Sequence, residues 1–133
     1  MTDYAGQSYP TICPYLYYED GVAAMDWLAK AFGFRERTRT VNADGSLRHA
    51  EMELGNGVIM IGTPSDHKNP AHLGQVTVGI YVHVDDVDHH YQQAKASGAD
   101  IDSPPSDQAY GVRSYGAHDP EGHQFWFSQA LDT

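Results

Sequence analysis

The chain has 133 residues, with 8 Lys or Arg against 18 Asp or Glu, so its formal net charge is −10. A length of this order is typical of one domain whose core is large enough to need no disulfide. The negative charge disfavours nucleic acid and anionic membrane surfaces as partners.

No segment of the sequence has the pattern of a membrane span or of a secretory leader. The longest aliphatic run covers residues 58–61, whereas a span needs about 20 apolar residues. The first basic residue is Lys30, so the start lacks the charged region of a leader. The single Cys13 excludes an intramolecular disulfide. We therefore expect a cytoplasmic protein with no membrane partner.

The first half predicts a strand, a helix and three further strands after a polar arm. Asp20 is a good N-cap and Gly33 a good left-handed C-terminal residue, and apolar residues between them follow helical spacing. Asp44-Gly45 marks a hairpin turn. The predicted elements are an arm over 1–10, a strand over 11–18, a helix between Asp20 and Gly33, and strands over 35–41, 47–54 and 58–62.

The second half predicts the same series after a Pro-containing linker over 64–74. Residues 76–84 alternate between apolar and other side chains, as a half-buried strand does. The predicted elements are that strand, a helix capped by Asp85 and ending before Gly98, a loop over 103–111, and strands over 112–117 and 123–128.

The two halves repeat one another. Asp20, the run Ala29-Lys30-Ala31 and Gly33 recur 65 residues later as Asp85, Ala94-Lys95-Ala96 and Gly98. We therefore predict an α+β fold of two tandem βαβββ units, over 11–63 and 75–129, within a single domain over 1–133. Their strands are expected to form a curved mixed sheet around a cavity.

Strand alternation assigns a set of aromatic and polar side chains to the concave face of that sheet. Such a lining is typical of a small-molecule pocket, and the alternative is that the rings simply fill the hollow. These candidate ligand-binding residues are Tyr15, Tyr17, His49, Glu51, Tyr81, His83 and Trp126, with Tyr110 and Arg113 added from the 103–113 region. Arg113 fits two roles equally, binding a ligand carboxylate or pairing with an acid such as Asp119.

Several stretches together resemble a known family. The runs Pro14-Tyr15-Leu16, Arg48-His49-Ala50-Glu51-Met52, Tyr110-Gly111-Val112-Arg113 and Asp119-Pro120-Glu121-Gly122-His123 occur in the order and spacing typical of it. In these features the chain is similar to the vicinal oxygen chelate superfamily, which includes glyoxalase I, extradiol dioxygenases and bleomycin-binding proteins, and it most resembles the PhnB-like branch. The resemblance implies a small-molecule ligand and a homodimer, which would also cover exposed sheet edges.

Enzymes of that superfamily hold a divalent metal with four inward side chains, two from each unit. The resemblance carries these positions onto Cys13, Glu51, Gly79 and Trp126. Glycine has no side chain and an indole cannot ligate, whereas a catalytic metal needs about three protein ligands. We therefore expect neither a metal nor another cofactor.

Three functions follow, in order of preference. The first is a metal-free binding protein that holds a planar or amphipathic organic ligand, for resistance or sequestration. The second is a divalent-metal-dependent lyase, isomerase or dioxygenase in which His49, Glu51 and His83 form a displaced metal site. The third is a metal-free acid–base catalyst built on Glu51 and His83. Four further imidazoles, in the linker and on the second helix, are expected to be solvated; they are His67, His72, His89 and His90.

Overall fold

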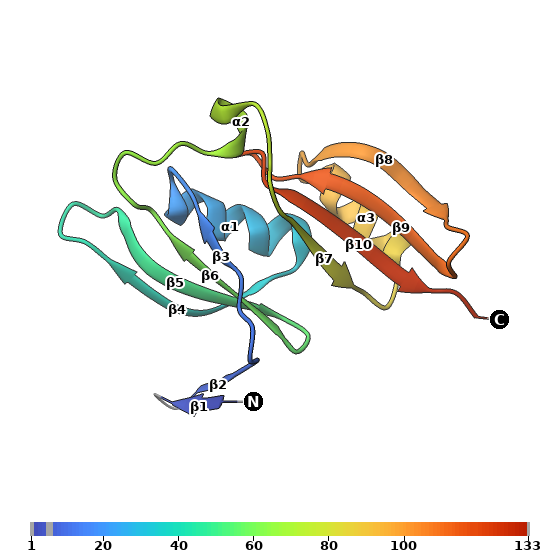
Figure 1. The fold of residues 1–133 in the computed structure, drawn as a ribbon, viewed down its shortest axis with the longest axis horizontal. Coiled ribbons are helices and arrows are strands. Elements are labelled where there is room, and N and C mark those ends of the chain that lie inside the picture. The colour runs from blue at the N-terminus through green and yellow to red at the C-terminus, as the bar shows by residue number, and fades with distance from the viewer. Residues whose placement is uncertain (1, 5–6, 133) are drawn as a thin grey trace. The chain divides into compact units, whose positions relative to one another are not determined.

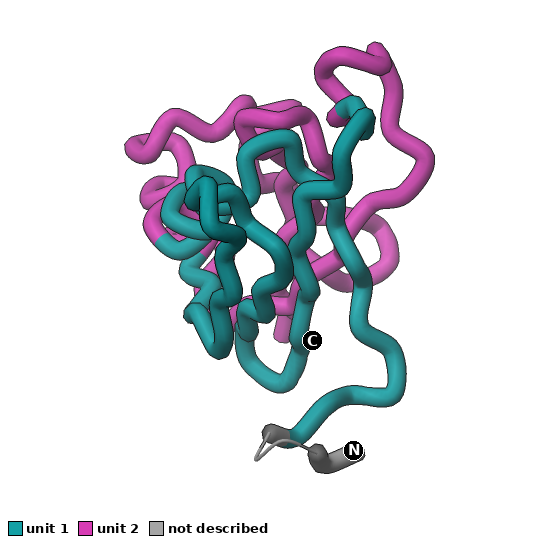
Figure 2. Tube along the Cα trace, turned by 90° about the vertical axis from the view of Figure 1, so that its left-hand side faces the viewer, with its two compact units in different colours: residues 1–29, 33–68 teal, residues 30–32, 69–133 magenta. Residues whose placement is uncertain are grey.

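The computed structural model describes residues 2–4 and 7–132 (Figure 1). It confirms the predicted α+β fold class, with two mixed four-stranded sheets, neither of them closed. By compactness the chain divides into unit 1 (residues 1–29 and 33–68) and unit 2 (residues 30–32 and 69–133), coloured teal and magenta in Figure 2. The single domain over 1–133 and the repeat boundaries at 11–63 and 75–129 stay predictions.

Unit 1 contains the predicted strand–helix–strand–strand–strand series. Asp20 caps the helix through a hydrogen bond from the Ala23 amide to its carboxylate (3.1 Å), and Gly33 ends it with φ of 83°. The elements are β1 (Thr2–Tyr4), β2 (Gln7–Tyr9), β3 (Tyr15–Tyr17), α1 (Gly21–Phe32, its last turn in unit 2), β4 (Arg35–Val41), β5 (Leu47–Leu54) and β6 (Gly57–Gly62).

The arm was expected to lack structure, and for the residues described this is wrong. Strands β1 and β2 pair antiparallel, with Thr2 opposite Tyr9. Residues 1, 5 and 6 of the predicted arm lie outside the described residues. The arm ends in the buried Tyr9, whose ring gives this polar segment one anchor in unit 1.

The sheet of unit 1 has the order β3-β6-β5-β4, in which β3 runs parallel to β6 and the other pairs are antiparallel. Alternation works as predicted, because Leu16, Ala50 and Ile61 are buried on one face. Tyr15 and Tyr17, which flank Leu16, remain exposed on the other face.

Unit 2 repeats this topology with the order β7-β10-β9-β8, and β7 runs parallel to β10. Helix α3 packs on one face of the sheet, against β8, β9 and β10 (Figure 1). The elements are α2 (Pro70–Leu73), β7 (Gly79–His83), α3 (Val87–Ala96), β8 (Asp100–Asp107), β9 (Val112–His118) and β10 (Gln124–Ala130).

Several boundaries in unit 2 differ from the prediction. The strand expected over 76–84 covers only Gly79–His83, and Val78 just before it is exposed. The strand expected over 123–128 covers Gln124–Ala130. Asp86, not Asp85, is the N-cap of α3, since its carboxylate accepts a hydrogen bond from the His89 amide (3.1 Å). Residues 103–107, expected as part of a loop, continue β8 through Pro104 and Pro105. Proline is tolerated there because β8 is an edge strand, whose outward N–H groups need no partner.

His90 was expected to be solvated, and the structure shows it half-buried instead. Its Nε2 donates to the carbonyl of Phe32 (2.8 Å), so Nδ1 accepts from the hydroxyl of Tyr115 (2.6 Å). Burial lowers the pKa of His90, because the charged form would lose solvation. The imidazole belongs to the core of unit 2, where Phe32 packs on Phe125 and Phe127 at centroid distances of 5.0 and 4.7 Å.

In both units the first amide of the main helix donates a hydrogen bond to a side-chain oxygen. In unit 1 the Gly21 amide donates to Oγ1 of Thr63 (3.1 Å), and in unit 2 the Val87 amide donates to Oε1 of Gln129 (2.9 Å). The sequence repeat is therefore also a repeat of contacts. None of the helices in the described part of the chain has the length and hydropathy of a membrane span.

Candidate functional site

The exposed face of the unit 1 sheet carries a chain of hydrogen-bonded side chains. The hydroxyl of Tyr15 lies 2.9 Å from Nδ1 of His49, and Nε2 of His49 lies 3.2 Å from Oε2 of Glu51. Tyr9 donates its hydroxyl to Oε1 of the same carboxylate (2.6 Å). Glu51 is only 6% exposed, so these bonds compensate for the loss of water around its carboxylate.

The carboxylate fixes the direction of these bonds. An ionised Glu51 only accepts, so His49 must donate from Nε2, and the neutral ring then accepts at Nδ1 from the Tyr15 hydroxyl. Burial, and to a smaller extent the neighbouring Tyr17, raise the pKa of Tyr15, which keeps its hydroxyl protonated. We call this arrangement the Tyr15–His49–Glu51 chain.

Glycine at position 62 lets Tyr15 lie close to the sheet. A Cβ atom at Gly62 would come within 3.0 Å of both Cε1 and the hydroxyl oxygen of Tyr15. Tyr15 is nevertheless 43% exposed, and its contact with His49 holds the hydroxyl in place.

A pocket of about 440 Å³ opens beside Tyr15. The Tyr17 ring meets His67 edge-on at 4.7 Å and Tyr15 at 5.5 Å between centroids, so the aromatic wall is held by ring contacts. We call it the Tyr17 pocket; its lining is Tyr15, Tyr17, Asn42, Leu47, Arg48, Gly62, Thr63, Pro64 and His67.

Arg48 and His67 are residues of this pocket that the sequence reasoning missed. Arg48 is exposed, and within the described residues it has no ion pair. Arg35, Arg39 and Arg113, by contrast, all pair with carboxylates. The only sequence signal was the position of Arg48 beside His49, while nothing marked His67 within its loop.

In unit 2 the corresponding face carries a second group of rings. Trp126 lies across two glycines, because a Cβ at Gly116 would come 2.5 Å from its six-membered ring and one at Gly79 would come 3.4 Å from Nε1. Tyr81 on the adjacent strand contacts His83 at 5.4 Å between centroids. Tyr81 and Trp126 are 47% and 38% exposed.

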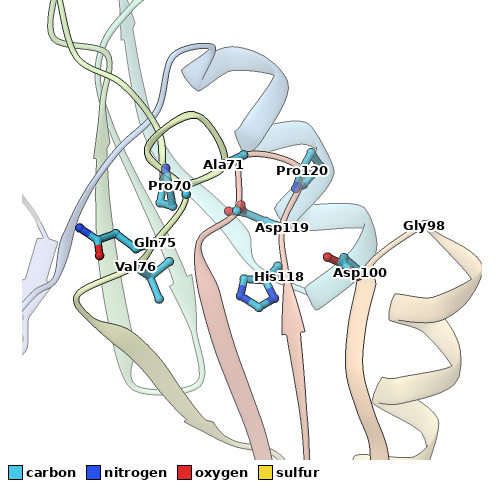
Figure 3. A pocket seen from close by; sticks show the side chains of 11 residues that line it. Pro70, Ala71, Gln75, Val76, Gly98, Asp100, His118, Asp119 and Pro120 are labelled. Carbon is cyan, nitrogen blue, oxygen red and sulfur yellow. The ribbon is translucent and has the colours of Figure 1, made fainter.

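Unit 2 also has a wider pocket of about 560 Å³ between α2 and the start of β8, lined by His118, Asp100 and Asp119 among others (Figure 3). Two of its polar residues are used by the fold. Asp119 accepts from the amides of Glu121 and His123, and His118 pairs with Asp102 at 2.9 Å. This arrangement secures the turn before β10 and leaves few groups for a ligand.

Tyr110 and Arg113 lie apart from these rings. Tyr110 is 69% exposed beyond the end of β8. Arg113 donates to Asp88 of α3 (2.9 Å) and to Asp107 (3.1 Å), which places it on the helix side of the sheet, opposite Trp126. Of its two predicted roles the structure shows acid pairing, although not with Asp119.

The predicted site residues thus fall into three sets. Unit 1 brings together Tyr15, Tyr17, His49 and Glu51, as predicted from strand alternation. Unit 2 brings together Tyr81, His83 and Trp126, while Tyr110 and Arg113 join neither group.

Strand registers show which residues are equivalent in the two units. Trp126 pairs with Tyr81 and Gly116, whereas Met60 pairs with Tyr15 and Glu51. Met60 is therefore the repeat equivalent of Trp126, and Glu51 is the equivalent of Gly116. A pair of metal ligands related by the repeat would fall on Met60 and Trp126, not on Glu51.

The side chains at the resemblance-derived positions do not fit a divalent metal. Whether the second position is Glu51 or Met60, Gly79 and Trp126 supply no donor, so the set never reaches three ligands. Cys13 is directed at the carbonyl of Pro10 at 3.5 Å. Across the residues that the structure describes, no group of three or more His, Cys, Asp or Glu could hold a metal ion.

With this geometry in place, comparison with known proteins identifies the family. A model of the Glyoxalase/Bleomycin resistance protein/Dioxygenase superfamily matches residues 11–127, and the chain belongs to that superfamily. The uncharacterized protein Mb0911c of Mycobacterium bovis is 31% identical over 92% of this chain and 84% of its own.

Solved structures agree with this assignment. TioX from Micromonospora sp. ML1 is 33% identical, with a TM-score of 0.75 over 94% of this chain and 100% of its own. A glyoxalase/bleomycin resistance protein/dioxygenase from Nocardioides shares the fold at 20% identity, with a TM-score of 0.68 over 96% of this chain and 88% of its own.

Proposed function

We propose that this protein binds a planar organic molecule without a metal, and that the Tyr17 pocket is its ligand site. One observation carries the proposal: aromatic walls fixed by ring contacts stand beside a cation, Arg48, that has no carboxylate partner among the described residues.

The chemistry of the pocket favours a flat aromatic ligand with an anionic group. Each stacking or edge contact with Tyr17 and His67 contributes about 1 kcal/mol beyond burial. The Arg48 guanidinium is suited to a carboxylate, which it can bind through two parallel hydrogen bonds. Trp126 and Tyr81 give unit 2 a second aromatic surface for the same class of molecule.

Metal independence is part of the proposal. The alternative, a divalent-metal-dependent lyase, isomerase or dioxygenase, would need ligands that Gly79 and Trp126 cannot supply. It would also compete with the hydrogen bonds that already engage His49 and Glu51. Sequestration of the ligand, including resistance to a toxic one, is therefore the role we propose.

Calorimetric titration with 2-naphthoate, a planar aromatic carboxylate, tests this function. We expect wild-type protein to bind it, and Tyr17→Ala and Arg48→Gln to weaken binding about tenfold each, since each removes one specific contact. Matched controls are Tyr110→Ala, an exposed tyrosine outside the pocket, and Arg35→Gln, an arginine paired with Glu53. Absence of binding, or equal loss in the controls, would refute the proposal.

We further propose that the protein belongs to the PhnB-like branch, forms a homodimer and works in the cytoplasm. The runs around Tyr15, His49 and Tyr110 support the branch, and the edge strands of both sheets offer surfaces for a second copy. A single free thiol at Cys13 fits a reducing compartment. Light scattering of the purified protein tests the dimer directly.

A further inference from the structure

We infer that the ligand of the Tyr17 pocket carries a hydroxyl group that donates a hydrogen bond to the phenolic oxygen of Tyr15. The natural ligand class is then a hydroxyl-bearing aromatic compound of the phenol type. This inference rests on the proposed function and deepens it by naming the group that the pocket recognises.

The hydrogen bonds of the Tyr15–His49–Glu51 chain all run in one direction, from the tyrosine towards the carboxylate. The buried carboxylate of Glu51 accepts a hydrogen bond from Nε2 of His49, and Nδ1 of His49 accepts one from the Tyr15 hydroxyl. The opposite tautomer would bring the bare Nε2 lone pair 3.2 Å from a carboxylate oxygen, with no proton between two acceptors. With a neutral imidazole at position 49, the hydroxyl hydrogen of Tyr15 is therefore directed at Nδ1.

The direction of this hydrogen decides which hydrogen bonds Tyr15 can make with a ligand in the pocket. With its hydrogen directed at His49, Tyr15 presents only oxygen lone pairs to a bound molecule, so it acts as an acceptor and not as a donor. The ring is 43% exposed and lines the Tyr17 pocket, so a ligand can reach that oxygen. Because Gly62 has no Cβ, which would lie 3.0 Å from this oxygen, the site has room for the hydroxyl at this position.

Unit 2 provides an internal comparison. By strand register Tyr81 is the equivalent of Tyr15, but Ser114 and Gly116 stand where unit 1 has His49 and Glu51. The hydroxyl of Tyr81 therefore has no imidazole–carboxylate pair to fix its direction. Tyr81→Phe is a matched control for Tyr15→Phe.

The test compares 6-hydroxy-2-naphthoate with 6-methoxy-2-naphthoate, which differ by one donated hydrogen. Binding is measured by calorimetry at about pH 8, where a free imidazole is neutral and an aryl hydroxyl keeps its proton. Wild-type protein should prefer the hydroxyl compound roughly fivefold to tenfold. Tyr15→Phe should bind the two equally, Glu51→Gln should lower the preference, and Tyr81→Phe should retain it.

The outcomes separate this inference from the proposed function. If 2-naphthoate binds but the two substituted compounds bind equally, or if the preference survives in Tyr15→Phe, the inference is overturned. The proposal that the Tyr17 pocket is the ligand site is then kept. If neither substituted compound binds while 2-naphthoate does, the inference also fails. If no naphthoate binds, both fail. Circular dichroism of each variant establishes that it is folded.

Discussion

At the scale of single residues, the two tyrosine–histidine pairs show how position decides what a side chain does. His49 and His90 each accept from a tyrosine hydroxyl at Nδ1, but the Tyr15–His49 pair is exposed and the Tyr115–His90 pair lies within a cluster of phenylalanines. The first pair can meet a ligand. The second connects α3 to β9 and to the end of α1 within unit 2, so its role is stability.

His90 predicts a pH-dependent stability. Because its pKa in the folded protein lies below the ordinary value of 6.5, the unfolded chain binds a proton more readily. Its contribution is complete above about pH 6.5 and is lost as the pH falls through the lowered pKa. Urea unfolding between about pH 8 and pH 5 should show a smaller loss of stability in His90→Gln than in wild type. In His89→Gln, which removes only the smaller coulombic effect of the exposed neighbour, the loss should remain larger than in His90→Gln. A loss in His90→Gln that matches wild type would contradict the assignment.

Sequence alternation placed Tyr15, Tyr17, His49 and Glu51 on one face because a strand leaves each side chain only two directions. It could not reveal the bonds among them, which depend on rotamers and on the register between β3, β5 and β6. Arg113 shows the same limit. Its face follows from the β9–β10 register, in which it pairs with Gln129, but its partners lie on α3 and β8, which no local pattern contains.

At the scale of elements, helix termini and edge strands account for the errors. Asp85 and Asp86 are neighbours of the same type, so composition cannot choose between them as a cap. The choice depends on which of them takes the extended backbone that precedes the first turn, and this is Asp86, with φ of −137° and ψ of 90°. A run with two prolines suggested a loop, but an edge position makes proline harmless in β8.

The assignment of Asp86 as the N-cap predicts that alanine substitutions at Asp85 and Asp86 change the free energy of unfolding by different amounts. Asp86→Ala should lower the free energy of unfolding by about 1 kcal/mol, because the His89 amide loses its acceptor. Asp85→Ala should change it by less than about 0.5 kcal/mol, since an exposed side chain without a structural contact contributes little. Chemical denaturation of both variants measures the difference, and equal effects would show that the cap is misassigned.

At the scale of the whole molecule, the internal repeat made the fold predictable before any strand was assigned with precision. The repeat is not uniform along the chain. The strands and caps recur at 66 residues, from Tyr15 to Tyr81 and from Asp20 to Asp86, whereas Gly33 recurs at 65 as Gly98. One residue fewer lies between cap and helix end in unit 2, and this shift explains why counting from Gly98 selected Asp85.

The metal-free proposal makes a prediction for the intact protein. Protein purified without chelator should contain no divalent metal in stoichiometric amount, because two of the four positions where the superfamily's enzymes bind one, Gly79 and Trp126, supply no donor. Inductively coupled plasma mass spectrometry of wild type and of Glu51→Gln gives the measurement. A stoichiometric ion that disappears in Glu51→Gln would refute the proposal and restore Glu51 as a ligand. The same ion retained in both would point to ligands elsewhere.

Gly116 and Trp126 occupy one shared volume, since even a methyl group on the glycine would overlap the six-membered ring of the indole. A side chain at position 116 therefore requires a change at position 126. A homologue that gains a side chain at the first must shrink the second, and only such a paired exchange would give unit 2 space for a carboxylate like the one that unit 1 carries at Glu51.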